Sequence, residues 1–467
     1  MNELGTRAWA IAALGGMLLT GCAVGPNYLS PTPALPPSFS AANEAGAPPG
    51  LSSPSGDLSR WWRQFGDSTL SELIEEALGS NLSVALAEAR LRQARATRSV
   101  AAGALWPAVS ASATYERRSG PLYAAAGSPN LYQADLSAAF AIDLFGAIRR
   151  NVEAADASVE AAMEGTRDAE VSLAAQVALF YVQLRGYQQE ALTARNNVAQ
   201  QKKTAEITRK LYKVGFDSGL DIANAESLVA TTEAQIPVFE TGARQSIYTL
   251  SVLLGRSPGD LVGRLSAPGG LPSVPSEVAA GQPSDLVRRR PDVREAEAQL
   301  HAATAQIGAA EAALLPQFSI GAGANQQSGQ LSQWWNTSNL SLFVGPTMTW
   351  PIFQGGAGVA NVHLQEAARE EALITYRQTV LSATQDVENA LTAVTHEREH
   401  HRALGEAVAA DHKAVDLSLK LYTEGQTDFL NVLTAEKTLF TDELALDQSN
   451  ESVAADAIAL YLALGGG

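Results

Sequence analysis

Strict alternation of apolar and polar side chains marks four segments of this 467-residue chain. In the first segment, Val109 and Tyr115 lie on one face and Ser112 lies on the other. This period of two predicts β-strands with one solvated face. Strands of roughly ten to thirteen residues with one lipid-compatible and one watery face are typical of outer membrane proteins, and a soluble sandwich is the alternative. The four segments are about 107–118, 131–143, 316–327 and 339–351.

Two long segments without proline, 146–212 and 356–422, predict helices. At a rise of about 1.5 Å per residue, each helix would be about 100 Å long. Apolar residues recur there in steps of three and four, as at Val380, Ala383 and Val387, and such a coiled-coil seam requires partner helices. Shorter helices are expected at about 69–103, 220–255, 291–313 and 429–463, with Pro-rich coil at 24–56 and a Pro/Gly-rich linker at 257–283.

An internal repeat runs through the chain. The segment Leu-Tyr-Lys-Val-Gly at 211–215 matches Leu-Tyr-Thr-Glu-Gly at 421–425, and Leu-Phe-Gly at 144–146 matches Ile-Phe-Gln-Gly at 352–355. Both pairs are roughly 210 residues apart, so the chain contains two copies of one unit. We expect a first repeat over 61–256, a linker over 257–290 and a second repeat over 291–467.

The start of the chain predicts a signal peptide over residues 1–21. An apolar run from Ala8 to Leu19 follows the charged Arg7 and is shorter than the about 20 residues that a membrane-spanning helix needs. Cys22 follows Leu-Thr-Gly, which resembles a bacterial lipoprotein cleavage site, and a plain signal peptide is the alternative. We expect lipid attachment at Cys22, with acyl chains such as palmitate, and a lipid-anchored Pro-rich segment over 22–60. Ala23 after the cysteine favours the outer membrane by the same resemblance.

Composition narrows the function classes. The net charge of −16 argues against binding nucleic acid, which needs a basic face. A single cysteine permits no disulfide within the chain. No later segment is apolar enough for a membrane-spanning helix, so a membrane crossing would require strands. Four strands cannot enclose a water-filled pore, so an oligomer would have to supply the others.

One motif suggests an enzyme. The sequence from His396 through Glu397 to His400 matches the H-E-x-x-H pattern of zinc proteases, in which both histidines share a helix face. The motif lies inside a predicted coiled coil, and the metzincin continuation fails at Ala403 and Glu406. We therefore expect a solvated helix face with no metal, no cofactor and no catalytic residue. A zinc hydrolase and a surface scaffold are the alternatives from other classes.

Three motifs carry a family resemblance. They are Gly-Cys-Ala-Val-Gly-Pro-Asn-Tyr at 21–28, Arg-Arg-Pro-Asp-Val-Arg at 289–294 and the paired Tyr-x-x-Gly turns at Tyr212 and Tyr422. By these motifs the chain resembles TolC-like outer membrane factors of the NodT/OprM-like efflux lipoprotein branch. The resemblance covers nearly all of the mature chain.

The resemblance implies a mixed α and β membrane protein that forms a homotrimer. Three protomers of four strands each would form a 12-stranded transmembrane β-barrel that continues into a 12-helix periplasmic α-barrel. It implies a passive exit duct for efflux, or for type I-like protein export. The implied partners are a periplasmic adaptor (membrane fusion) protein, an inner-membrane transporter of the RND type and outer membrane lipid.

The turns that end the two long helices are the candidate functional site. Gly215, Gly219 and Gly425 permit turn conformations that other residues resist. In the resembled family these turns close the duct and dock the adaptor, and Gln426 lies in the second of them. Helix capping, for which Asp217 and Ser218 are suitable, is the alternative role of this region.

The resemblance also implies a periplasmic gate. Asp221 matches a gate aspartate of the family, which is paired there with a tyrosine that matches Tyr422. The second turn departs from the family pattern, because Asn431 and Thr434 replace aspartates and Thr427 replaces an arginine. A ring of like charges in a narrow pore selects cations and resists closure unless it is protonated or paired. We expect this ring to consist of Asp221, Glu424 or Asp428, with Tyr212 and Tyr422 beside it.

Overall fold

The computed structural model describes residues 23–41, 59–120, 130–275 and 282–466. The predicted signal peptide and the predicted lipid site Cys22 lie outside these residues. The chain forms two compact units, and each combines three separate stretches of sequence. The first unit takes residues within 1–32, 89–163 and 295–378, and the second takes residues within 33–88, 164–294 and 379–467.

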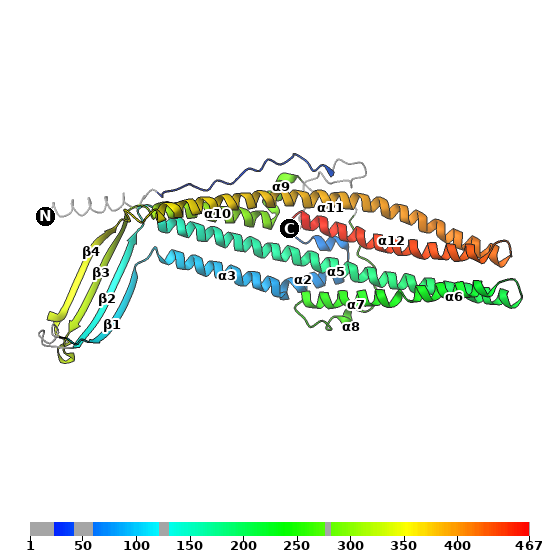
Figure 1. The fold of residues 1–467 in the computed structure, drawn as a ribbon, viewed down its shortest axis with the longest axis horizontal. Helices are drawn as coiled ribbons and strands as arrows, with labels where there is room; N and C mark the ends of the chain where they lie inside the picture. The colour runs from blue at the N-terminus through cyan, green and yellow to red at the C-terminus, as the bar shows by residue number, and fades with distance from the viewer. Residues whose placement is uncertain (1–22, 42–58, 121–129, 276–281, 467) are drawn as a thin grey trace. The chain divides into compact units, whose positions relative to one another are not determined.

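The first unit contains an antiparallel sheet of four strands in the order β1-β2-β3-β4 (Figure 1). The strands are β1 (Ala108–Arg117), β2 (Asn130–Ile142), β3 (Gln317–Ser328) and β4 (Leu340–Thr349). Each begins and ends within two residues of its predicted limits. Tyr132 of β2 pairs with Ser328 of β3, so distant parts of the chain become neighbours. The predicted apolar face is open on the single chain, since Val109 is 68% and Val344 77% exposed.

The two long helices are α5 (Ala147–Lys213) and α11 (Ala357–Thr423). Each follows a glycine with left-handed backbone, Gly146 at φ 83° and Gly356 at φ 87°, which lets the chain turn sharply out of the preceding strand. Asp143 caps α5, because its carboxylate accepts the backbone N–H of Arg149 at 2.9 Å. The seam predicted on the second long helix is confirmed, since all five of its apolar residues are buried: Val380, Ala383, Val387, Ala390 and Val394.

The shorter helices differ from prediction at two breaks and by two short helices within the predicted linker 257–290. The shorter helices are α2 (Ser68–Ser80), α3 (Leu82–Gly103), α6 (Gly219–Glu233), α7 (Ile236–Leu253), α8 (Val262–Leu265), α9 (Pro283–Arg289), α10 (Pro291–Ala312) and α12 (Phe429–Ala463). The helix expected at 69–103 breaks at the extended residue Asn81, whose carboxamide oxygen accepts the N–H of Ser83 at 2.7 Å. The helix expected at 220–255 breaks before α7, because Pro237 cannot continue a preceding helix. No helix among the described residues is both long and apolar enough to cross a membrane.

Residues 23–30 form an extended segment, here called the N-terminal strap, that lies against α5 and α10 within the first unit. Arg150 donates to the carbonyl oxygen of Val24 at 3.2 Å. Gly25 packs so closely on Gly308 that a Cβ at Gly25 would lie 2.4 Å from the Gly308 Cα. Tyr28 stacks on His301 with ring centroids 4.3 Å apart. The strap is therefore held by packing that only glycine permits.

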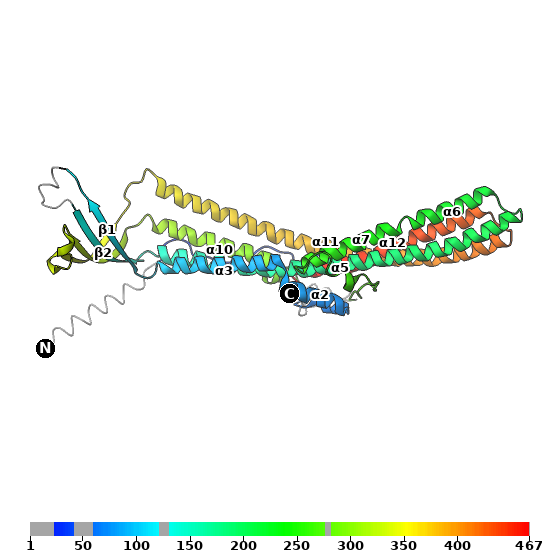
Figure 2. The same cartoon turned by 90° about the horizontal axis from the view of Figure 1, so that it is seen from below.

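In the second unit, α6, α7 and α12 lie beside the later parts of α5 and α11 (Figure 2). Its aromatic core joins the last helix to the 3-10 helix Trp61–Phe65. Trp61 stacks on Tyr461 at 5.2 Å between centroids, and Phe65 contacts both rings edge-on. Tyr461 also donates its hydroxyl to Gln64 at 2.8 Å. Aromatic pairs of this kind contribute beyond the area that they bury.

Candidate functional site

Both long helices end in the same turn. Residues 214–218, here called the first turn, join α5 to α6, and residues 424–428, the second turn, join α11 to α12. Gly215 has φ 84° and Gly425 has φ 71°. The N–H of Phe216 donates to the Leu211 carbonyl oxygen at 3.0 Å, and the N–H of Gln426 donates to the Leu421 carbonyl oxygen at 2.8 Å. These are Schellman motifs, which explains why both copies carry glycine at this position.

Gly219 does not use a special conformation. It is the first residue of α6 and is not among the described glycines with positive φ, so the turn conformation expected for it is wrong, and its role in adaptor docking stays a prediction. Ser218 caps this helix, because its hydroxyl oxygen accepts the N–H of Asp221 at 3.3 Å. Asp221 returns a bond by accepting the N–H of Ser218 at 3.1 Å. The two residues form a capping box, so the capping interpretation is confirmed for Ser218.

Tyr422, the second-last residue of α11, connects the end of that helix to the first turn. Only 4% of the residue is exposed, and its hydroxyl donates to the carboxylate of Asp217 and lies 3.1 Å from the Thr208 hydroxyl. The tyrosine therefore bonds Asp217, where the resemblance implied Asp221. Burial raises the pKa of Tyr422, and the hydrogen bond to Asp217 raises it further, so the hydroxyl stays a donor.

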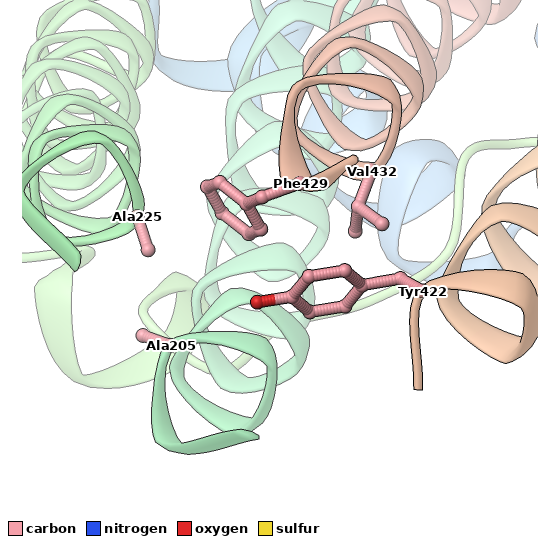
Figure 3. Packing of buried hydrophobic residues seen from close by; sticks show 5 residues of the cluster. All are labelled: Ala205, Ala225, Tyr422, Phe429 and Val432. Atoms are coloured by element: carbon pink, nitrogen blue, oxygen red, sulfur yellow. The ribbon is translucent and has the colours of Figure 1, made fainter. Parts of the chain in front are cut away.

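The ring of Tyr422 closes a small apolar cluster between the helices (Figure 3). Phe429 packs on it with centroids 5.5 Å apart, and Val432, Ala205 and Ala225 complete the cluster. These residues come from α5, α6, α12 and the end of α11, so one side chain ties four helices together near the turns. The buried ring stabilises the cluster by packing, and the hydroxyl orients the side chain through its hydrogen bond.

Carboxylates gather around a pocket of about 650 Å³ between the turns. Asp217, Asp221, Glu424 and Asp428 all line it. Three of these were predicted, and Asp217 was considered only as a cap. Asp428 precedes α12 without a side-chain capping bond, and Glu424 accepts a bond from Gln426 at 3.2 Å. No basic residue is among the pocket-lining residues in the described chain, so the pocket is a site of concentrated negative charge.

The other predicted residues lie on the surface near these turns. Tyr212 is 49% exposed. Apolar side chains also reach the solvent here, with Val214 at 66%, Phe216 at 79% and Leu430 at 64% exposed. These apolar residues were not predicted as part of the site, although their position beside the turn glycines was a usable signal. Exposed apolar patches of this kind indicate interaction sites.

The histidines of the zinc-like motif engage neighbouring carboxylates on α11. His400 lies 3.3 Å from Glu397, and His396 lies 3.8 Å from Glu399. Glu397 also accepts a hydrogen bond from Ser449 of α12, so it is oriented toward a neighbouring helix. Among the described residues, no group of three histidine, cysteine or acidic side chains is arranged to hold a metal ion.

A sheet of four strands combined with paired long helices and glycine turns defines the mixed α and β fold of outer membrane channels, as comparison with solved structures shows. The solved outer-membrane channel OprN matches with a TM-score of 0.87 at 33% identity, over 96% of this chain and 99% of that one. Residues 73–256 and 283–466 match the family model described as outer membrane efflux protein. The chain belongs to the outer membrane efflux protein family, which confirms the predicted resemblance.

Two curated relatives support this assignment over most of their length. Nodulation protein T of Rhizobium leguminosarum bv. trifolii is 32% identical over 459 residues, covering 97% of this chain and 96% of the relative. The pyoverdine export outer membrane protein OpmQ of Pseudomonas aeruginosa is 31% identical over 421 residues, covering 88% of each.

Proposed function

We propose that this protein is the outer membrane channel of a tripartite efflux system, a passive exit duct across the periplasm that is gated at the two turns. Family membership supports the channel role. The observation that carries the gate is the contact between the turns, where buried Tyr422 bonds Asp217 above a pocket of carboxylates. No residue is assigned a catalytic role, and the energy for transport comes from the inner-membrane partner.

We infer that the duct is a homotrimer with a 12-stranded β-barrel, a 12-helix α-barrel and an internal repeat. Within the described chain, β1 and β4 each pair on one side only, which leaves two open edges. Open edges in lipid would leave backbone N–H and C=O groups unsatisfied, and closure with neighbouring protomers removes them. The exposed apolar face of the sheet supports the same arrangement.

The proposed gate combines a tether with a charge ring. Three copies of Asp221, Glu424 and Asp428 around a threefold axis would repel one another and attract cations. Within each protomer, the bond between Tyr422 and Asp217 opposes separation of the turns. Tyr212, more exposed than Tyr422, lies at the matching position of the first repeat and would contribute to the pore surface. Opening then requires breaking a buried contact in each protomer.

The proposed docking surface for the adaptor consists of the turns themselves. Gly215, Gly425 and Gln426 are exposed, and a Cβ at either glycine would meet no atom within 4 Å, so the backbone is open to a partner. The exposed apolar residues Val214 and Phe216 lie beside them. A periplasmic adaptor joined to an RND-type transporter fits this surface.

We also propose that lipid on Cys22 anchors the chain in the outer membrane while the helices extend into the periplasm. The N-terminal strap supports this arrangement, because Val24 donates its N–H to the Phe145 carbonyl oxygen at 3.0 Å. Several acyl chains on one residue hold a protein stably on a membrane.

Photo-crosslinking in cells tests the duct role. A photoreactive residue replaces Gln426 in the second turn, and a matched control replaces Gln333, which is exposed in the loop between β3 and β4. We expect the probe at position 426 to capture a periplasmic adaptor and the probe at position 333 to capture none. Failure to capture an adaptor from position 426, with the protein correctly in the outer membrane, would exclude the tripartite role.

A further inference from the structure

A column of buried polar side chains runs along α5 where a coiled-coil seam would ordinarily be apolar. Its members recur in steps of three and four, and none is more than 9% exposed. The column lies wholly within the second unit and approaches the first turn, where Thr208 lies beside the Tyr422 hydroxyl. The members are Glu190, Thr193, Asn197, Gln201, Thr204 and Thr208.

The column faces acidic residues of α12. Thr193 donates to Asp447 at 2.6 Å, and Thr204 donates to Glu436. Asn197 donates to Glu443 at 2.5 Å. Along this column, the polar contacts between α5 and α12 are therefore hydrogen bonds from neutral groups to carboxyl groups.

Glu451 extends the acidic row by one helical turn. A Cβ at Gly186 of α5 would lie 2.1 Å from its carboxyl oxygen, so this carboxyl group rests directly on the α5 backbone. Glu190 faces both Glu451 and Asp447, and Tyr187 faces Glu451. The contact therefore brings acidic groups of two helices within range of electrostatic interaction.

Cations are scarce at this interface. Within the described residues, Glu190, Glu436, Asp447 and Glu451 form no ion pair, and Glu443 is paired only with His412 of α11 at 3.2 Å. Of the other titratable groups that α11 presents to α12, His401 bonds the neutral Asn450 at 2.7 Å, and two are acidic: Glu397 faces Asp456, and Asp411 faces Asp442. A buried carboxylate without a cation is costly, so such a group tends to bind a proton.

The pKa shifts agree with this geometry. Burial raises the pKa of Glu190, Glu436 and Asp447. Burial, with a smaller contribution from the charge of Glu190, raises the pKa of Glu451 from 4.5 to about 7. Gln201 is a separate indication that this interface can rearrange, because both polar atoms of its buried amide lack a hydrogen-bond partner in the described chain. A buried amide without partners costs free energy in the paired arrangement of the two helices. It therefore reduces the free-energy difference between this arrangement and a looser one.

We infer that the α5–α12 interface is a proton-controlled clasp, in which protonated carboxyl groups hold the helices together and loss of protons loosens α12 from α5. A carboxyl group whose pKa is higher in the paired state binds its proton more tightly there. Pairing is therefore strongest below about pH 4.5 and weakens as the pH rises toward about 7 and above. The inference goes beyond the proposed duct role, and it would hold for the isolated protein.

Hydrogen exchange measured by mass spectrometry on the full-length protein tests the clasp, with protection factors corrected for intrinsic exchange at each pH. For a carboxyl group with a pKa of 4.5 when unpaired and about 7 when paired, linkage predicts that pairing weakens about tenfold between pH 6 and pH 8. We expect this fall in peptides from 186–208 and 436–451. Peptides covering the apolar seam at 380–394 should not change.

Charge-neutral variants make the test specific. Glu451→Gln, and independently Glu190→Gln, should flatten the pH dependence and keep the protection seen at pH 6. Glu406→Gln on α11 is the matched control, because its carboxylate is 70% exposed and paired with Arg402. Equal protection at both pH values in the parent protein would overturn the clasp. The same conclusion would follow if peptides from 380–394 lost protection to the same extent, or if Glu451→Gln and Glu190→Gln both kept the tenfold fall. The readout is helix pairing, so such a result would leave the efflux role untouched.

Discussion

Replacing Tyr422 with phenylalanine removes one hydroxyl group and leaves the ring in place. The apolar cluster around Phe429 and Val432 stays filled, so the change isolates the hydrogen bond to Asp217. Thr208 keeps a second bond, because its hydroxyl also donates to the Thr204 carbonyl oxygen at 3.1 Å. The variant therefore weakens the tether between the turns without creating a cavity.

The size of the effect depends on the free energy of the hydrogen bond from Tyr422 to its partner Asp217. A hydrogen bond to a charged group contributes about 1.5–3 kcal/mol. Asp217 is only partly buried, so solvent screening reduces this to about 1–2 kcal/mol. Because each 1.4 kcal/mol corresponds to about a tenfold change in an equilibrium constant, opening should become about 5–30 times more favourable in each protomer.

Single-channel recording in planar lipid bilayers measures this change as open probability. Tyr248→Phe is the matched control, because it removes the same hydroxyl from a side chain of α7 that is 40% exposed and lies outside the turns. We expect Tyr422→Phe to raise the open probability and Tyr248→Phe to leave it near the parent value. Equal open probabilities for Tyr422→Phe and the parent would refute the tether.

Three further predictions concern glycine and metal. Gly215→Ala should destabilise the first turn by about 1–2 kcal/mol, since alanine resists the left-handed conformation, whereas Gly219→Ala should be neutral. Limited proteolysis of the turn measures both variants. Faster cleavage of Gly219→Ala than of Gly215→Ala would contradict the Schellman assignment. Gly308→Ala should release the N-terminal strap, because the new Cβ would lie 2.7 Å from the Val24 carbonyl oxygen, and unchanged protease resistance of residues 23–30 would argue against it. Alanine at both His396 and His400 should change neither zinc content nor conductance, whereas stoichiometric zinc that is lost in this variant would favour the hydrolase alternative.

The strands and long helices could be predicted because their signals are local. The alternation that predicts a strand and the proline-free seam that predicts a helix can each be read from the residues of that segment alone. The break at Asn81 was missed because the helical pattern continues on both sides of it, and the break before α7 was missed although Pro237 marks it. Local patterns thus located the elements well and their interruptions poorly.

Most residues of the candidate site were predicted, but their hydrogen-bond partners were not. The glycine turns were visible as a repeated pattern, but the partner of Tyr422 depends on how two turns meet that lie 205 residues apart in sequence. The polar column on α5 was missed because threonine, asparagine and glutamine resemble solvated positions when the facing helix is unknown. Threonines at seam spacing, as at Thr204 and Thr208, were the available signal.

The interleaving of the two units sets an order for folding. The first unit is complete in sequence once residue 378 has been made, yet its β2–β3 pairing joins Tyr132 to Ser328 and must close a very long loop. The second unit needs the last segment, 379–467, because α12 supplies the partners of α5. Such non-local pairing slows folding, so a newly made chain spends a long time with sheet edges and helix seams uncovered. A chain that stops before α12 would retain every strand and lose the helix that faces the polar column of α5, which makes the final segment the step that commits this protein to its native state.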